Sequence, residues 1–509
     1  MTGIVKRDRY LNIIIHIAII VFFLFFFIHQ CPLVIFDTDD WIGLGNFRAP
    51  IPIWGGWNPS RVLPETLMPA AGWIAAHIVY PLCGDYVYSV TIISAVIITL
   101  LIAGMSICLQ RLLVVRYRLA ETSALACEIF FIILFFLIFR NRGTSACMFT
   151  AADLCCIYNY TIPGILNAIV VLILLRNEDI TETFLSWNLI QKILFLLMIY
   201  FALFSHLFHS AITAIYAGIY LLLSIWFCKR NIKQILRKNS IMFLILAMWG
   251  TALVFEASGG RAGSLEGELD FVKALRQLAA MIRALSKPFI LISVALFIVI
   301  VVHMWKKRFF NQTEFVSIFV NIICNEMFLV IFLLLLNTKT AYMSRIDASW
   351  GMWFYLITMM VVALAYVIRE ASAISQILPI MIPILVFAAV YPDGKFLMST
   401  RENTDYQTCL QLDYYVINSI VEASEKEMAE IEIRIPDHSE DLRSLTYNEN
   451  LGKVVADCLY TQGIIQNKPD VQTIVDKNMN DVFEKMVKIR RLTDGLEYEN
   501  TSLTERSQH

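Results

Sequence analysis

The sequence predicts an all-α polytopic membrane domain followed by a small α+β domain, and two observations carry that prediction. Of the 509 residues, 58% are hydrophobic and only 16% are charged, whereas soluble domains carry about 25% charged residues to cover their surface. Apolar stretches of about 20 residues also recur along the chain, and each can cross a hydrocarbon core of roughly 30 Å as a helix. Lipid is therefore the expected solvent for most of the chain.

About eleven transmembrane helices are expected, all within a membrane domain that covers residues 1–391. The first span is too long and too bulky for a cleaved signal peptide, and no small-residue cleavage site follows it. The number depends on dividing the apolar stretch near residue 206 into two spans, because merging them would move the C-terminal end of the chain across the membrane. The expected spans are 11–30, 86–109, 123–139, 161–175, 190–204, 208–227, 240–256, 288–304, 315–336, 350–367 and 376–391.

Clusters of Lys and Arg predict the orientation of these spans. They occur at the N-terminus and at alternate connections, within 111–118, 229–238 and 306–308. Cytoplasmic loops of membrane proteins are enriched in Lys and Arg. The N-terminus is therefore expected in the cytoplasm, and an odd number of spans places the C-terminal end outside.

Three segments are expected to lie outside the membrane core. The first external loop, 31–85, contains a short, proline-bounded apolar stretch that we expect to lie along the interface or dip into it. The second, 257–287, begins as a glycine-rich loop and ends as an amphipathic helix. Residues 392–509 have the composition of a soluble protein, and helical spacing from Tyr414 followed by the alternating run EIEIRI before Pro436 predicts a small extracytoplasmic α+β domain.

The first candidate site is acidic and directly follows the first span. Asp37, Asp39 and Asp40 place three carboxylates within four residues, where they repel one another and are costly to desolvate. Such a cluster suits either a general base that stays ionised or a divalent metal such as Mg or Mn, held by Asp37 and Asp39. A solvated acidic cap that marks the exit from the membrane is the alternative interpretation.

The residues that follow add groups suited to a sugar and a phosphate. Arg48, Trp57, Arg61 and Glu65 lie in the same external loop among several glycines. Indole faces stack on sugar rings, glycines let the backbone approach a ligand closely, and a guanidinium binds phosphate oxygens with two hydrogen bonds. An interfacial aromatic belt would explain the tryptophans but not Arg61 or the glycines.

Other ionisable residues fall near the expected outer ends of spans, where a charge is costly and therefore a functional candidate. Arg261 and Arg345 are the chief candidates. His206 and His209 are spaced like metal ligands on one helical face, but no third ligand lies in sequence reach, so hydrogen-bonded histidines are favoured over zinc. The remaining candidates are Arg140, Arg142, Asp153, Glu256, Lys339 and Asp347.

Together, the first span, the loop with paired acids, the Trp-and-Arg segment, the many spans and the trailing outside domain resemble the GT-C glycosyltransferases. The chain looks most like the O-antigen glucosyltransferases of bacteria and phages, which use a polyprenyl-phosphate sugar donor. The motif part of the resemblance covers about residues 30–85. It implies a bacterial plasma membrane, a lipid-linked hexose donor and a surface glycan as acceptor.

The resemblance also implies roles for individual residues. Asp39 or Asp40, with Asp39 favoured, would deprotonate the acceptor hydroxyl in an inverting displacement, and Asp37 would support it. Arg61, and after it Arg261 or Arg345, would stabilise the leaving lipid phosphate.

Two other functions fit a polytopic chain of this kind. A flippase for lipid-linked sugars needs polar groups along a path through the spans, whereas the polar candidates here concentrate on one side. An O-antigen polymerase or ligase is the other alternative, and the loop 257–287 is compatible with it. No nucleotide-binding loop or Rossmann-like motif is present in a convincing context, and no nucleic-acid partner is expected.

Overall fold

The protein is described from a computed structural model. It describes, by number, residues 2–35, 37–140, 146–151, 153–228, 237–263, 269–307, 313–339, 342–370, 382, 384–386, 406–437 and 448–483. Helices dominate these residues, and the described strands are β1 (Glu430–Pro436) and β2 (Asp470–Asp476). This composition confirms a mostly helical chain.

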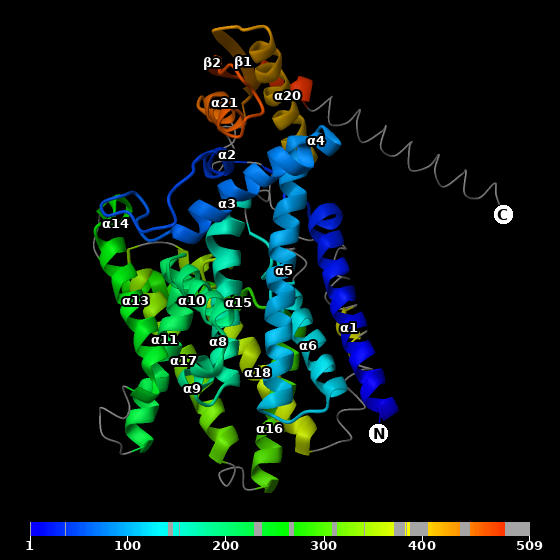
Figure 1. Ribbon diagram of the computed structural model, residues 1–509, viewed down its shortest axis with the longest axis vertical. Helices are drawn as coiled ribbons and strands as arrows, with labels where there is room; N and C mark the ends of the chain where they lie inside the picture. The colour runs from blue at the N-terminus through cyan, green and yellow to red at the C-terminus, as the bar shows by residue number, and fades with distance from the viewer. Residues whose placement is uncertain are drawn as a thin grey trace, which may run out of the picture.

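Eight stretches of helix are long and apolar enough to cross a membrane within the described residues. Apart from the run Val62–Cys83, which lies across one end, they run roughly parallel in Figure 1 and form one bundle. Their elements are α1 (Thr2–Phe25) with η1 (Phe26–Gln30), α3 (Val62–Ile74) with η2 (Ala75–Val79) and α4 (Tyr80–Cys83), α5 (Tyr86–Val115), α7 (Leu154–Cys156) with η3 (Ile157–Thr161) and α8 (Ile162–Arg176), α11 (Leu207–Cys228), α13 (Ser240–Ala257), α17 (Thr313–Leu336) and α18 (Trp350–Glu370).

Further helices complete the bundle. Three of them, α6, the shorter apolar α10 and α16, lie where spans are expected from the sequence, and α15 is the amphipathic helix expected at the end of loop 257–287. Every expected span up to 350–367 therefore falls on a helix, while 376–391 lies almost wholly outside the described residues. The further elements are α6 (Glu121–Leu137), α9 (Ile180–Ser186), α10 (Leu189–Leu203), α14 (Gly260–Gly263), α15 (Phe271–Arg283), α16 (Lys287–Lys307) and η5 (Tyr342–Ser344).

Near residue 206 the apolar stretch is divided into two helices, α10 and α11, which run in opposite directions. At the C-terminal end of α10, the Tyr200 hydroxyl donates to the carbonyl of Pro50 at 2.7 Å. Towards the far end of α11, the Tyr220 hydroxyl donates to the carbonyl of Glu178 at 2.9 Å. Glu178 in turn pairs with Arg116 at the end of α5. The chain thus crosses the bundle twice here.

Four elements near the C-terminus lie beyond one end of the bundle, which we name the tail end (Figure 1). They are α20 (Tyr406–Glu425), β1, α21 (Leu451–Thr461) and β2. The two strands pair in parallel, with Glu430 opposite Asp470 and Pro436 opposite Asp476. The helix and the strand expected in this region are both present.

The C-terminal elements pack on the first loop, through the short helix α2 (Thr38–Gly45). The amide of Gln462 donates to the carbonyl of Leu44 at 2.5 Å. A Cβ at Gly45 would lie 3.1 Å from the Cα of Cys458, so a larger residue would require the backbone of α21 to shift. Loop 31–85 and the C-terminal elements therefore lie on the same side of the bundle, as expected.

The helical run from α3 to α4 begins and ends at the tail end. Leu63 donates its N–H to the carbonyl of Phe204, at the end of α10, at 2.9 Å. The run ends at Gly84, directly before α5 begins beside the tail, where the Tyr414 hydroxyl donates to Asp85 at 2.6 Å. Although its length would allow a crossing, both ends lie on one side. This agrees with a segment that lies along the interface.

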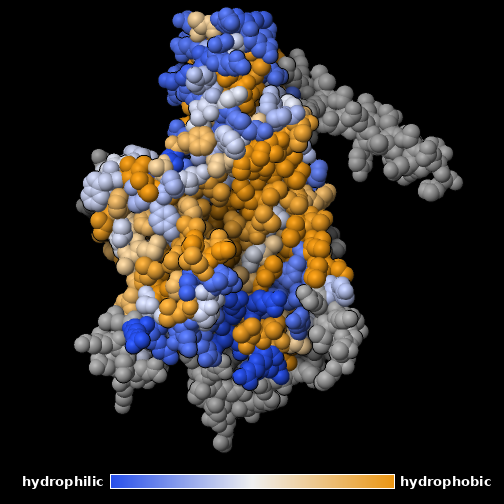
Figure 2. All heavy atoms as spheres, viewed as in Figure 1, coloured by the Kyte–Doolittle hydropathy of each residue, from blue (hydrophilic) through white to orange (hydrophobic). Residues whose placement is uncertain are grey.

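On the face shown in Figure 2, an apolar surface lies between two hydrophilic ends of the molecule. Leu189, Ile190 and Leu194 on α10 are each exposed although fully apolar. Single exposed apolar side chains are ordinary, but a continuous band of them is compatible with a bilayer as the surrounding medium. Inside the band, the core is packed with aromatic rings, such as Phe23 against Phe149 with ring centroids 5.2 Å apart.

Candidate functional site

The acidic segment forms the N-terminus of α2. Asp37 is the N-cap, and its carboxylate accepts the N–H of Asp39 at 3.1 Å. In return, the carboxylate of Asp40 accepts the N–H of Asp37 at 3.1 Å. This reciprocal capping box satisfies backbone donors that a helix start leaves open. Asp37 and Asp40 therefore stabilise the start of α2.

Asp40 is also fully buried and joins α2 to α7. Its second oxygen accepts the N–H of Cys155. Burial raises the pKa of Asp40 well above its usual value, and the nearby carboxylates of Asp153 and Asp37 raise it further. Asp39, in contrast, is exposed. Of the three acids, Asp39 is the one that presents its carboxylate to the surface.

Arg48 and Glu65 bind each other and close the loop between them. The Arg48 guanidinium donates to the Glu65 carboxylate at 2.5 Å and to the carbonyls of Ile51, Asn58 and Pro59 at 3.0 to 3.1 Å. The Asn58 amide also donates to Glu65, at 2.9 Å. These contacts stabilise the loop and occupy most donors of Arg48.

Arg61 has a different environment, because its described partners are all neutral. The residue is only 7% exposed. Its guanidinium donates to the Asn159 side-chain oxygen and to Nε2 of His206, each at 3.1 Å. Within the described residues no carboxylate pairs with Arg61, and its buried Nε has no hydrogen-bond partner. Burial lowers the pKa of Arg61 and the charge of Arg261 lowers it further, whereas the carboxylates of Glu256 and Glu65, which are not in hydrogen-bond contact with it, act in the opposite direction.

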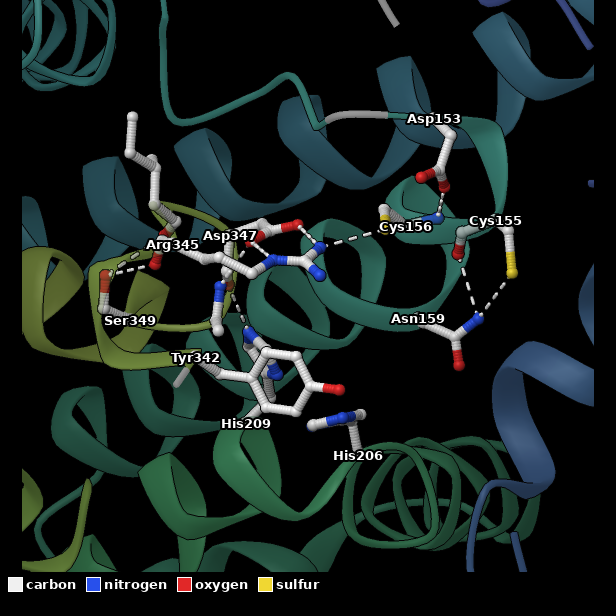
Figure 3. Close-up of polar contacts among 12 residues, drawn as sticks. Asp153, Cys155, Cys156, Asn159, His206, His209, Tyr342, Arg345, Asp347 and Ser349 are labelled. Atoms are coloured by element: carbon white, nitrogen blue, oxygen red, sulfur yellow. Dashed lines mark hydrogen bonds and ion pairs between the residues drawn. The ribbon is translucent and has the colours of Figure 1, made fainter. Parts of the chain in front are cut away.

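Arg345 lies nearby but carries its own counter-ion. Figure 3 shows its guanidinium between Asp347 and Cys156. It forms a two-point ion pair with Asp347, at 3.0 and 2.6 Å, and lies 4.8 Å from the centroid of the Tyr160 ring. It is also 5.6 Å from the ring of Tyr342. Paired and stacked in this way, Arg345 is held rigidly.

Arg261 approaches the same group from the second long loop. It donates to the Tyr342 hydroxyl at 3.1 Å and lies 3.5 Å from the side-chain oxygen of Asn58. Burial lowers the pKa of His206 well below its usual value, and the charges of Arg61, Arg261 and Arg345 lower it further. His206 is therefore neutral at physiological pH, and its Nε2 accepts from Arg61. We name Arg61, Arg261, Arg345 and His206 the arginine cluster.

Trp57 joins the two external loops near this cluster. Its indole packs on Gly260, where a Cβ would lie 2.9 Å from the ring. Gly260 donates its N–H to the carbonyl of Gly56 at 3.0 Å, and Arg261 donates its N–H to the carbonyl of Trp57 at 3.3 Å. The Trp57 side chain remains 61% exposed, so one of its faces is open to a ligand.

The acids and the arginine cluster meet around the α7–η3 segment. At the start of this segment, the N–H of Cys155 donates to the carboxylate of Asp40. One helical turn later, Asn159 contacts Arg61 and Tyr160 contacts Arg345. The structure thus brings together Arg61, Arg261 and Arg345 from the predicted set. The helix α2, which carries the acids, contacts α7 of the same segment, while Arg48 and Glu65 bind each other.

A metal at Asp37 and Asp39 stays a prediction. The part of the chain that the structure describes has no group of three His, Cys, Asp or Glu side chains arranged to hold a metal ion. Asp37 uses its carboxylate to accept from the Asp39 N–H and the Thr38 hydroxyl. The two acids therefore do not form a ready ligand set in this arrangement.

Some residues of the site carried no clear signal in the sequence. Asn159, Tyr160 and Tyr342 lie in apolar or unremarkable stretches, and their proximity to arginines follows only from the fold. His206 and His209 were expected to be hydrogen-bonded, and they are: Nε2 of His209 lies 2.9 Å from the carbonyl of Asp347. Arg142 lies outside the described residues.

Comparison with known proteins adds no family to this picture. No protein-family model matches the chain, and no curated protein matches it. The resemblance to GT-C glycosyltransferases, which residues 30–85 carry, therefore remains a prediction. What the chain is shown to be is a mostly helical protein with several helices able to span a membrane.

Proposed function

We propose that the protein is a GT-C type glycosyltransferase that moves a hexose from a polyprenyl-phosphate donor to a surface glycan. In this proposal the tail end faces the outside of a bacterial plasma membrane. The observation that carries the proposal is the buried guanidinium of Arg61, which contacts no carboxylate among the described residues. A buried charge without a counter-ion is costly unless a ligand supplies the opposite charge.

The arginine cluster supports an anionic ligand at this position. Arg61 and Arg261 repel each other, and neutral His206 lies between guanidinium groups rather than beside an acid. The negative charge of a phosphodiester placed here would offset the repulsion between the arginines and would pair with the buried charge of Arg61. Because the cluster lies where apolar helices end, the polyprenyl chain of the same ligand would remain in lipid.

Asp39 supports the transfer step. Its exposed carboxylate takes the proton of the acceptor hydroxyl as the hydroxyl oxygen bonds to the anomeric carbon. The bond from that carbon to the phosphate oxygen breaks, and its electron pair leaves with the polyprenyl phosphate. The leaving phosphate gains one negative charge, which Arg61 and Arg261 stabilise more strongly than the charge of the donor. Trp57 offers an open indole face for a sugar ring.

The test uses purified full-length protein in nanodiscs with a panel of polyprenyl-phosphate hexoses and a surface-glycan acceptor. Release of polyprenyl phosphate and formation of glycosylated acceptor are measured by mass spectrometry, with and without chelator. Asp39→Asn should lower transfer by about 100- to 10,000-fold, the usual contribution of a general base. The matched control Asp481→Asn, an exposed acid far from α2 in sequence, should transfer at the wild-type rate.

Two results would overturn the proposal. Transfer from no donor of the panel would remove the assigned activity. Movement of an intact lipid-linked sugar across the membrane, equal in wild type and Asp39→Asn, would indicate a flippase instead.

A further inference from the structure

We propose that α15 lies on the membrane surface and that its basic edge binds the headgroups of anionic phospholipids. Nothing in the proposed glycosyl transfer requires this helix to do so. The inference rests on the direction of α15, on the order of residue types around it and on its neighbours.

The direction of α15 is set by the next helix. Taken together, Phe271–Arg283 and Lys287–Val299 are apolar enough for a membrane-associated pair, yet they meet at 89°. The second helix, α16, exposes Leu291, Val294 and Phe297, as a lipid-facing span does. If α16 crosses the membrane, a helix at a right angle to it lies parallel to the membrane plane.

Three sectors follow one another around α15, because successive residues of an α-helix rotate by about 100°. Ala274 and Met281 are buried and face the protein. The next sector consists of Phe271, Leu275 and Ile282, each more than half exposed. A contiguous exposed group of large apolar side chains such as this one is typical of a surface that contacts lipid or a partner.

The third sector is basic. Arg276 and Arg283 are exposed beside the apolar sector, and Lys273 is exposed further round. α15 itself contains no acid, and Asp270 uses its carboxylate to cap the helix at the N–H of Lys273. An exposed apolar stripe flanked by bases is the arrangement of a helix at the boundary between acyl chains and headgroups. Its charge is complementary to an anionic lipid surface.

The neighbours of α15 locate it near the tail end. Asp270 donates its N–H to the carbonyl of Thr338 at 3.0 Å. α15 also packs against η5, whose Tyr342 contacts Arg261 and Arg345. A headgroup-binding helix at this position would hold the arginine cluster at the depth of lipid phosphates.

Crosslinking tests the depth of α15. Benzoylphenylalanine is introduced at Leu275 in the full chain and irradiated in nanodiscs of phosphatidylglycerol and phosphatidylcholine. The expected result is a phospholipid adduct at this position and none at the control position Tyr460, which is equally exposed but lies on α21. Absence of phospholipid adducts at position 275 would overturn the inference, as would adducts with polyprenyl lipid alone.

A charge variant tests headgroup recognition separately. K273Q/R276Q/R283Q removes three bases from α15, and K426Q/K468Q/K477Q removes three exposed bases from the C-terminal elements. Bound phosphatidylglycerol relative to phosphatidylcholine is counted by native mass spectrometry. Each base near an anionic surface contributes roughly fivefold, so the α15 variant should lose up to about 100-fold in preference. Equal loss in both variants, or loss in neither, would overturn the inference.

These readouts do not depend on sugar transfer. The protein can therefore fail as a glycosyltransferase and still show α15 at the lipid surface, or the reverse.

Discussion

Replacing Arg61 with methionine should leave the empty protein as stable as wild type or more stable, while it removes binding of polyprenyl phosphate. Methionine has a similar length and no charge, so it fills the space without a desolvation cost. Most arginine replacements at buried positions destabilise, because they break an ion pair and strand its acid. Among the described residues, no acid is in hydrogen-bond contact with Arg61, and Glu256 and Glu65 have other partners.

The magnitude follows from the contacts. The buried guanidinium costs several kcal/mol in desolvation, and two hydrogen bonds to neutral acceptors offset most of that cost. The net change for Arg61→Met is therefore expected between zero and a gain of about 3 kcal/mol. Arg48→Met in the same loop is the matched control. It strands Glu65 and three carbonyls, and should lose about 3 kcal/mol.

The assay is thermal unfolding of the purified full chain, with and without polyprenyl phosphate. A ligand present at about 100 times its Kd stabilises a protein by about 2.7 kcal/mol. Wild type should show this gain and Arg61→Met should not. If Arg61→Met melts at a temperature as low as that of Arg48→Met, then Arg61 stabilises the fold, and its guanidinium is not an uncompensated buried charge. If it still gains stability from the lipid, the anion binds elsewhere.

Three further predictions concern α2 and the C-terminal elements. The carboxylate of Asp40 accepts the N–H groups of Asp37 and Cys155, whereas an asparagine side chain has only one acceptor oxygen. Asp40→Asn should therefore lower the free energy of unfolding by about 1–3 kcal/mol. A variant that melts at the wild-type temperature would contradict this. Burial raises the pKa of Asp413 well above its usual value. The native state therefore keeps a proton that the unfolded chain releases near pH 4. The free energy of unfolding consequently falls as the pH rises from about 4 through the folded-state pKa of Asp413. Asp413→Asn should thus melt later than wild type at pH 8 and like wild type at pH 4, and a difference independent of pH would refute the cause. Gly45→Val should push α21 away from α2, because Gly45 lies against Cys458. The C-terminal elements should then be cleaved faster in a timed protease digest. An unchanged digest would show that the contact between Gly45 and Cys458 does not hold these elements in place.

The spans could be predicted because their signal is local. A stretch such as 86–109 is apolar over its whole length, and α5 (Tyr86–Val115) extends it by only a turn or two. The opposite directions of α10 and α11 were also predictable, since polar residues near Ser205 interrupt an otherwise apolar run. The helix and strand near the C-terminus followed from their periodicity in the same way.

The site was less predictable because it depends on contacts between distant residues. The types of Arg61, Arg261 and Arg345 and their expected location suggested an anion site, and the fold brings them together. Which acid is open to solvent could not be read from the segment Asp37–Asp40, because the burial of Asp40 depends on Cys155, 115 positions away. Likewise, the neutral environment of Arg61 depends on His206, 145 positions away.

The docking of the C-terminal elements on α2 has a consequence for biosynthesis. Leu44 emerges from the ribosome early, but its partner Gln462 follows 418 positions later. Until then α2 lacks the neighbour that covers one of its faces, and its acids are held only by the capping box and by α7. The loop therefore reaches its final form only after the last segments have been translated and have reached the same side of the membrane. A chain that stops short of α21 would insert its helices normally and yet leave α2 unsupported.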